Sequence, residues 1–225
     1  MDTPPPRTEP TEPVQEDIEA FRRQLGRPPR GLRAIAHRCP CGLPDVVETA
    51  PRLEDGTPFP TTYYLTCPRA ASAIGTLEAN GVMKEMTVRL QEDEELAAAY
   101  WAAHEDYLAR RDAIEVLAGF PSAGGMPDRV KCLHVLVAHS LVAGPGVNPL
   151  GDEALAMLPE WWRKGRCVQV PAPGEAPAPA TADGGTDSPE HAAAGDGTRT
   201  DGGRGGATDG ATDGDVNGDT DGERA

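Results

Sequence analysis

The carboxyl-terminal stretch, residues 171–225, limits what this chain can fold into more than any other feature. It holds almost nothing apolar beyond alanine and one valine, and it repeats Gly, Asp, Thr, Ala and Pro. Such a segment cannot bury enough apolar surface to offset the entropy lost on ordering. Residues 1–13 are similarly rich in Pro and Thr. We therefore expect a disordered arm over residues 1–13, one globular domain over residues 14–168 and a disordered acidic tail over residues 169–225.

The charge is concentrated in that tail. Of a net charge of −15, the tail from residue 171 contributes twelve acidic residues against three arginines, so the globular part is only mildly acidic. No basic stripe is present, and we do not expect nucleic-acid binding. No charged-then-apolar leader opens the chain and no apolar run is long enough to cross a membrane, so we expect a cytoplasmic protein without membrane contact. Five cysteines in that compartment indicate metal binding, thiol chemistry or burial rather than disulfides.

Local patterns predict an α+β fold. Apolar residues at helical spacing predict a helix from Val14 to Leu25. Runs of β-branched and aromatic residues predict three strands, over residues 32–36, 45–49 and 61–66. Apolar residues at helical spacing predict four further helices, over residues 68–79, 93–117, 128–142 and 152–164. We therefore expect a small antiparallel sheet between about residues 32 and 66, packed with a mostly helical C-terminal half.

Soft metal ligands gather in a short turn at residues 37–42. In an extended segment alternate side chains face the same way, so His37, Cys39 and Cys41 are expected to project together. Cys67 follows a predicted strand and precedes Pro68, which favours the first helical position and makes Cys67 a candidate N-cap. A sulfur at a helix N-terminus is expected to have a lowered pKa.

The remaining ligands lie in the helix predicted over residues 128–142. Within a helix, Cys132 and His134 would point about 200° apart, and Cys132 and His139 would lie about 10 Å apart along one face. No two of them then share an ion easily. The predicted metal ligands are Cys39, Cys41, Cys67 and Cys132, with His37 or His134 as alternatives for the fourth position, and the cofactor is zinc or an iron–sulfur cluster.

Two alternatives to a metal site remain open for these side chains. The cysteines pack as small apolar residues, or Cys67 or Cys132 serves as a reactive thiol. Of these two, Cys67 is expected to form a nucleophile–base pair with His134 or His139. Cys167, next to the tail, is expected to play no part.

A glycine-bearing loop over residues 122–131 is a candidate anion site. Free backbone amides at a helix start attract anions, and cationic side chains add to that attraction. The candidate anion-binding residues are Arg38, Gly124, Gly125, Arg129 and Lys131. The alternative is that the glycines only permit a tight turn.

Motifs such as Cys39-Pro40-Cys41-Gly42 resemble those of a bacterial family, domain-of-unknown-function family 501, over about residues 14–165. Further motifs that carry the resemblance are Gln24–Arg27, Gly56–Thr61, Tyr63–Pro68, Ser122–Pro127, Lys131–His134 and Gly144–Pro149. The resemblance brings no established activity and no catalytic residues. Members are often encoded near a septum-formation protein and an exopolyphosphatase, which implies, by association only, a partner in cell division. The tail looks like an actinobacterial addition.

Three functions follow as hypotheses. The first is a metal-binding domain, with zinc favoured over an iron–sulfur cluster. The second is an enzyme acting on a phosphorylated or otherwise anionic small molecule, with Cys67, Cys132 and His134 as catalytic candidates. The third is a non-catalytic interaction module whose cysteines are only packed.

Overall fold

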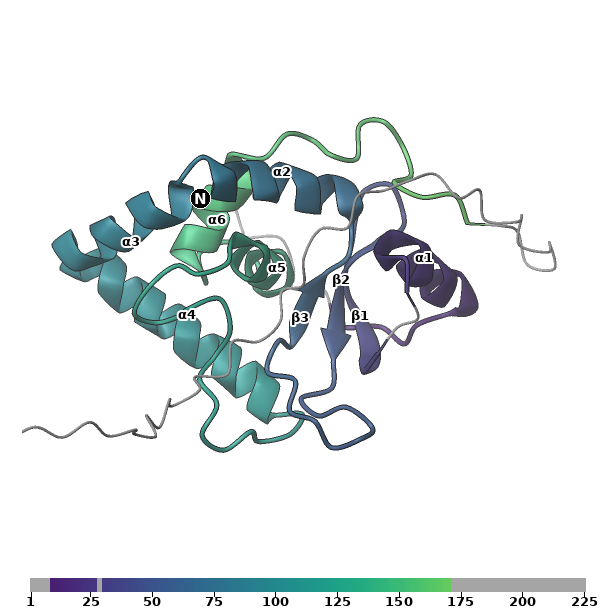
Figure 1. Cartoon of the computed structure of the whole chain (residues 1–225), viewed down its shortest axis with the longest axis horizontal. Helices are drawn as coiled ribbons and strands as arrows, with labels where there is room; N and C mark the ends of the chain where they lie inside the picture. The colour runs from purple at the N-terminus through teal and green to yellow at the C-terminus, as the bar shows by residue number, and fades with distance from the viewer. Residues whose placement is uncertain (1–8, 28–29, 171–225) are drawn as a thin grey trace, which may run out of the picture. The chain divides into compact units, whose positions relative to one another are not determined.

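The three strands form an antiparallel sheet in the order β1-β2-β3 (Figure 1). The computed structural model of the protein describes residues 9–27 and 30–170. The strands are β1 (Leu32–Arg38), β2 (Pro44–Thr49) and β3 (Tyr63–Leu65). The helices are α1 (Gln15–Leu25), α2 (Pro68–Ala79), α3 (Val82–Glu92), α4 (Glu94–Asp112), α5 (Leu133–Ala143) and α6 (Pro149–Ala156). This arrangement confirms the α+β prediction and the position of the sheet.

The sheet is buried on both faces, because helices cover each of them. Ile35 of β1 and Val47 of β2 pack with Phe21 of α1 in a small cluster. Their neighbours Ala36 and Val46 face the opposite way and join the main core, to which α5 contributes. Figure 1 shows α1 on one side of the sheet and α5 on the other. The alternation of strand side chains thus divides the apolar residues between two clusters.

Helix α5 is the centre of the main core, and eight of its eleven residues are buried. A helix that is apolar all round is stable only inside a protein. Helix α6 packs against it so closely that a Cβ at Gly151 would overlap the Leu136 carbonyl and the Ser140 hydroxyl. Glycine at position 151 is therefore required by packing rather than by backbone conformation.

Helix α5 starts later than the sequence pattern predicted. The expected start was residue 128, but the helix begins at Leu133, with Cys132 as its N-cap residue. Gly124 and Gly125 have positive φ angles of 75° and 92° and form a turn. The amides of Lys131 and Cys132 both donate to the Gly124 carbonyl, at 2.7 and 3.3 Å. The glycine turn therefore keeps the residues before Leu133 out of the helix.

Other predicted boundaries also shift. The last helix covers Pro149–Ala156 instead of residues 152–164. Asn148 caps it by accepting the Gly151 amide, and Pro159 blocks its extension. Thr11, placed in the disordered arm, pairs with Ile35 through two backbone hydrogen bonds, so the ordered chain begins before residue 14. Apart from residues 169 and 170, the predicted tail lies outside the described residues.

None of the helices in the described ranges has the length and apolar character that crossing a membrane requires.

Candidate functional site

The first predicted ligands, Cys39 and Cys41, lie in the turn between β1 and β2. Cys39 is buried and Cys41 is half-buried, and the Cys41 amide donates to the Cys39 sulfur at 3.5 Å. Burial raises the pKa of Cys39 to about 12, so its thiol stays protonated at neutral pH. His37 does not turn towards the cysteines; its Nδ1 lies 2.6 Å from the buried carboxylate of Asp45.

Cys67 is the N-cap residue of α2, as predicted, but its expected thiolate character is wrong. The interaction with Cys167 and burial both raise the pKa of Cys67. The same interaction lowers the pKa of Cys167 to about 6, with burial opposing it and the Gln24 hydrogen bond adding to it. At Cys67, the neighbouring thiol and burial outweigh the backbone amides of Ala70 and Arg69, which lower the pKa. Cys167, expected to play no part, is the partner that the structure gives to Cys67.

The predicted four-cysteine set is not brought together. Within residues 9–27 and 30–170, one group of three or more Cys, His, Asp or Glu side chains has its ligand atoms within 4.8 Å of one another. That group is Glu78, Cys132 and His134, and it contains neither of the turn cysteines nor Cys67.

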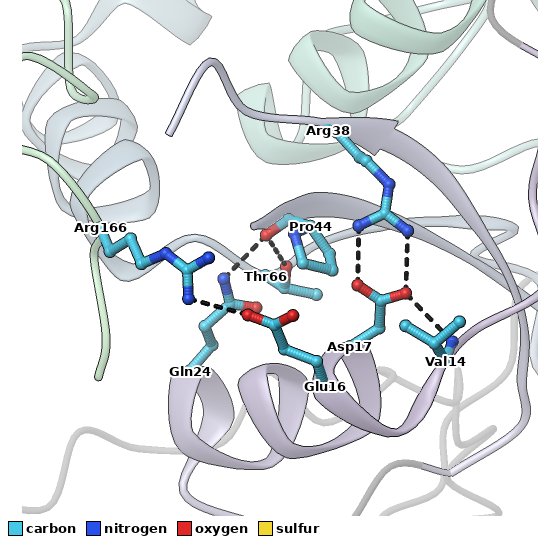
Figure 2. A network of polar contacts seen from close by, with 8 residues as sticks. All are labelled: Val14, Glu16, Asp17, Gln24, Arg38, Pro44, Thr66 and Arg166. Atoms are coloured by element: carbon cyan, nitrogen blue, oxygen red, sulfur yellow. Dashed lines mark hydrogen bonds and ion pairs between the residues drawn. The ribbon is translucent and has the colours of Figure 1, made fainter. Parts of the chain in front are cut away.

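Arg38, one of the predicted anion-binding residues, has a partner elsewhere in the fold. Both terminal nitrogens of Arg38 bind the nearly buried carboxylate of Asp17, at 2.7 and 2.8 Å (Figure 2). Arg38 is thus occupied by a structural ion pair. Arg129 and Lys131 are exposed. A Cβ at Gly125 would lie 2.7 Å from the Arg129 carbonyl, so this glycine is needed to close the turn.

The cluster of Glu78, Cys132 and His134 is built where α2 meets the start of α5. Glu78 lies in the last turn of α2, and Cys132 and His134 flank the first residue of α5. Because Cys132 precedes the helix, the separation of about 200° expected within a helix does not apply. The Cys132 Sγ lies 3.8 Å from the His134 Nδ1, and the Glu78 Oε1 lies 3.2 Å from the same nitrogen.

Two further contacts fix this geometry. The His134 Nε2 lies 3.2 Å from the backbone carbonyl of Ala71, which can only accept a hydrogen bond. The proton on that side of the ring is therefore held on Nε2, and Nδ1 faces the cluster. The Leu133 amide donates to the Glu78 Oε1 at 2.7 Å, so Glu78 also satisfies a free amide at the start of α5.

The cluster is electrostatically coupled. Burial alone would lower the pKa of His134, but its contacts with Cys132 and Glu78 outweigh burial and raise the pKa to about 10. Burial would raise the pKa of Glu78, but the hydrogen bond and charge of His134 hold it below its usual range. Without a metal, the cluster is thus an imidazolium beside a carboxylate at neutral pH.

Sequence reasoning missed Glu78. It lies more than fifty residues before Cys132 in an ordinary helical run, so no spacing links the two. One local signal was available, because Ala71 and Glu78 are seven residues apart and share a face of α2. His134 contacts both of them.

His139, the alternative base, belongs to another part of the core. It is fully buried, its Nε2 lies 2.9 Å from Asp106 and its Nδ1 lies 3.3 Å from the Asn148 amide. It also stacks on Tyr63. His139 is therefore a fully bonded core residue that ties α4 to the loop before α6.

Comparison with known proteins gives a family and nothing further. A sequence model described as "Protein of unknown function (DUF501)" matches residues 35–156, more than half of the chain. The chain belongs to the DUF501 family. No curated protein and no solved structure matched. The DUF501 match covers the sheet except the first residues of β1, and it includes the glycine turn and the cluster of Glu78, Cys132 and His134.

Proposed function

We propose that this DUF501 protein binds a divalent transition metal, zinc, through Glu78, Cys132 and His134. The main support for the proposal is that two potential ligand atoms approach the same nitrogen of His134. The Cys132 sulfur and a Glu78 oxygen both approach the His134 Nδ1, while the Nε2 is turned to a backbone carbonyl. Zinc-binding histidines characteristically donate their second nitrogen to such a carbonyl, which fixes the ring and its tautomer.

The distances suit a tetrahedral ion. Ligands at about 2.0–2.3 Å from zinc stand roughly 3.3–3.6 Å from one another. The separations of 3.8 Å from sulfur to nitrogen and 3.2 Å from oxygen to nitrogen need only small adjustment. The proton on Nδ1 would leave when the metal binds, as ligation requires.

The donor types select among metals. One sulfur, one nitrogen and one oxygen form a mixed set of the kind zinc accepts, whereas calcium and magnesium take oxygen ligands. Iron–sulfur clusters typically use four thiolates, and this group contains one cysteine. Zinc therefore fits the residues better than the other cofactor considered.

Three protein ligands leave one tetrahedral position for water or a bound molecule. Such open positions are characteristic of catalytic zinc sites, while structural sites are closed by four protein ligands. The side chains of Glu78 and His134 are 16% and 26% exposed, so solvent reaches the group. Zinc chemistry on a small molecule is therefore the activity that the proposal favours.

A cysteine nucleophile activated by His134 is less well supported. In a nucleophile–base–carboxylate relay, the nucleophile and the carboxylate occupy opposite nitrogens of the histidine. Here Cys132 and Glu78 compete for Nδ1.

Metal analysis of untagged protein, purified anaerobically with a reductant, tests the proposal. About one zinc per chain is expected, and it should be lost in Cys132→Ser and in His134→Gln. Cys41→Ser is the matched control, because Cys41 is also a half-buried free cysteine and lies outside the group. In cobalt-substituted protein, thiolate-to-metal absorption should be present in wild type and in Cys41→Ser and absent in Cys132→Ser.

Three results would overturn the proposal. The first is metal-free protein that fails to take up zinc under these conditions. The second is unchanged zinc content in both Cys132→Ser and His134→Gln. The third is metal loss in Cys41→Ser with Cys132→Ser unaffected, which would return the site to the β1–β2 turn.

A further inference from the structure

A second pair of cysteines, Cys67 and Cys167, lies outside the proposed metal site. Cys67 caps α2 at its N-terminus and is almost fully buried, whereas Cys167 is half-buried in the segment after α6. The two belong to the same apolar cluster, and hydrogen bonds from Arg69 to the carbonyls of Gly165 and Arg166 bring the segment of Cys167 to the start of α2. A buried sulfur thus has a more accessible sulfur beside it, a hundred positions later in the chain.

The segment that carries Cys167 is held in place by polar contacts. The Arg69 guanidinium donates to the carbonyls of Gly165 and Arg166, at 2.8 and 3.0 Å. Arg166 in turn pairs with Glu16 of α1 at 2.8 Å (Figure 2). Because Arg69 and Cys67 are two residues apart, this clamp holds Cys167 over the start of α2.

The surroundings of Cys167 favour its thiolate. The Gln24 Nε2 donates to the Cys167 sulfur at 3.3 Å and to the Pro44 carbonyl at 2.7 Å. An amide that donates to sulfur stabilises the anion. The interaction with Cys67 is the largest effect on the pKa of Cys167, and although burial opposes it, Gln24 and the charge of Arg69 add to it and the pKa is lowered to about 6.

We propose that Cys167 and Cys67 form a two-cysteine redox site that hydroperoxides oxidise to a disulfide, with Cys167 as the attacking thiolate and Cys67 as the resolving thiol. The assignment of roles follows from access. Cys167 is the more exposed of the two, and Cys67 needs only to reach its neighbour.

The chemistry balances in two steps. The Cys167 thiolate attacks one peroxide oxygen; a sulfur–oxygen bond forms, the oxygen–oxygen bond breaks, and the departing hydroxide or alkoxide takes a proton from solvent. The Cys67 sulfur then attacks the sulfenic acid on Cys167; a disulfide forms, and the hydroxyl group leaves with the Cys67 proton as water. Two thiols lose two electrons to one peroxide, and a dithiol reductant restores them.

The consequence for the structure is a covalent link between the segment after α6 and the start of α2. Residues 165–167 are already positioned there by Arg69 and Arg166. The link closes a loop of about a hundred residues, which restricts the unfolded chain.

The test uses the full chain, reduced and then treated with hydrogen peroxide. Remaining thiols are blocked, and peptides are mapped by mass spectrometry without reduction. A linked pair of peptides containing Cys67 and Cys167 is expected, and a dithiol should remove the link. In Cys67→Ala, oxidation should stop at a sulfenic acid on Cys167 that dimedone traps. Cys41→Ser is the matched control and should form the link as wild type does.

Two outcomes would overturn the proposal. One is that Cys167 stays reduced while peroxide oxidises Cys41 or Cys132. The other is that Cys167 is oxidised and finds a partner other than Cys67. Circular dichroism of each variant separates loss of the pair from loss of folding. If Cys67→Ala does not fold, Cys167→Ser supplies the same test, because Cys67 should then remain reduced.

Discussion

Replacement of Glu78 by glutamine separates its role in metal binding from its role in folding. Glutamine has almost the same shape and keeps an oxygen that the Leu133 amide can donate to. It removes the negative charge beside His134. Alanine at the same position removes both the charge and the acceptor. The two variants therefore differ in whether the first free amide of α5 keeps its partner.

The expected magnitudes follow from these contacts. Loss of an outer partner typically lowers metal affinity 10–100-fold, so loss of a charged direct ligand should lower zinc affinity by at least about 100-fold, or about 2.7 kcal/mol. Both variants should show this loss. Glu78→Ala should also lower the stability of the metal-free protein by about 1 kcal/mol more than Glu78→Gln, because it leaves the Leu133 amide without an acceptor.

The pH dependence of the metal-free protein gives an independent measurement. The pKa of His134 is raised from 6.5 to about 10 in the folded state. Its stabilising contribution is therefore complete below pH 6.5 and is lost as the pH rises through about 10. Glu78→Gln should lower the pKa of His134 and flatten this part of the stability curve, because one of the two partners that raise it becomes neutral.

Competition with a chelating zinc indicator gives the affinity, urea unfolding gives the stability, and NMR titration gives the pKa of His134. Glu85→Gln is the control, an exposed carboxylate on α3. The reasoning is refuted if Glu78→Gln binds zinc as tightly as wild type. Equal stability of the glutamine and alanine variants would refute the capping role alone.

Three further predictions concern packing, acid stability and thiol reactivity. Gly151→Ala should destabilise the protein by about 1–3 kcal/mol in urea unfolding, because its Cβ would overlap α5, whereas Gly75→Ala, with open space in α2, should be neutral or stabilising. Burial would raise the pKa of Asp106, but hydrogen bonds from His139 and Arg110 outweigh burial and hold the pKa below 3.8. The ionised carboxylate therefore stabilises the fold above pH 3.8, and this stability is lost as the pH falls. Asp106→Asn should be less stable at pH 7 and change less on acidification; an unaltered acid-unfolding curve would contradict this. Alkylation of Cys167 by iodoacetamide should reach half its maximal rate near pH 6, and its independence of pH between 5 and 8 would contradict the thiolate assignment.

Much of the fold was readable from local pattern. The α1 helix and the three strands were predicted close to their observed bounds, because alternation and helical spacing are strong over those segments. The start of α5 was not predicted correctly, because Gly124 and Gly125 form a turn and the Gly124 carbonyl accepts hydrogen bonds from the amides of Lys131 and Cys132. The predicted start of α5 at residue 128 placed Cys132 and His134 in one helix, so the sequence argument excluded the two side chains from sharing an ion.

The candidate site was likewise predicted only in part from the sequence. Its chemistry-bearing residues Cys132 and His134 were among those singled out, but they were assigned to different alternatives because a helix was assumed through both. Glu78 was missed, since a glutamate in a helix is usually a solvated surface residue. Arg38 and Cys167 were misjudged for the same reason: their partners Asp17 and Cys67 are distant in sequence.

By itself, the sequence determined the α+β class, the sheet between residues 32 and 65 and the types of side chain available for chemistry. Those properties depend on periodicity and composition, which act over a few neighbouring residues. Only the tertiary structure decided which side chains meet. The contact of α2 with the start of α5 brings Glu78 to His134, and the Arg69 clamp brings Cys167 to Cys67. Such pairings depend on how distant segments pack, because the buried surface and the hydrogen bonds that fix them exist only in the folded protein.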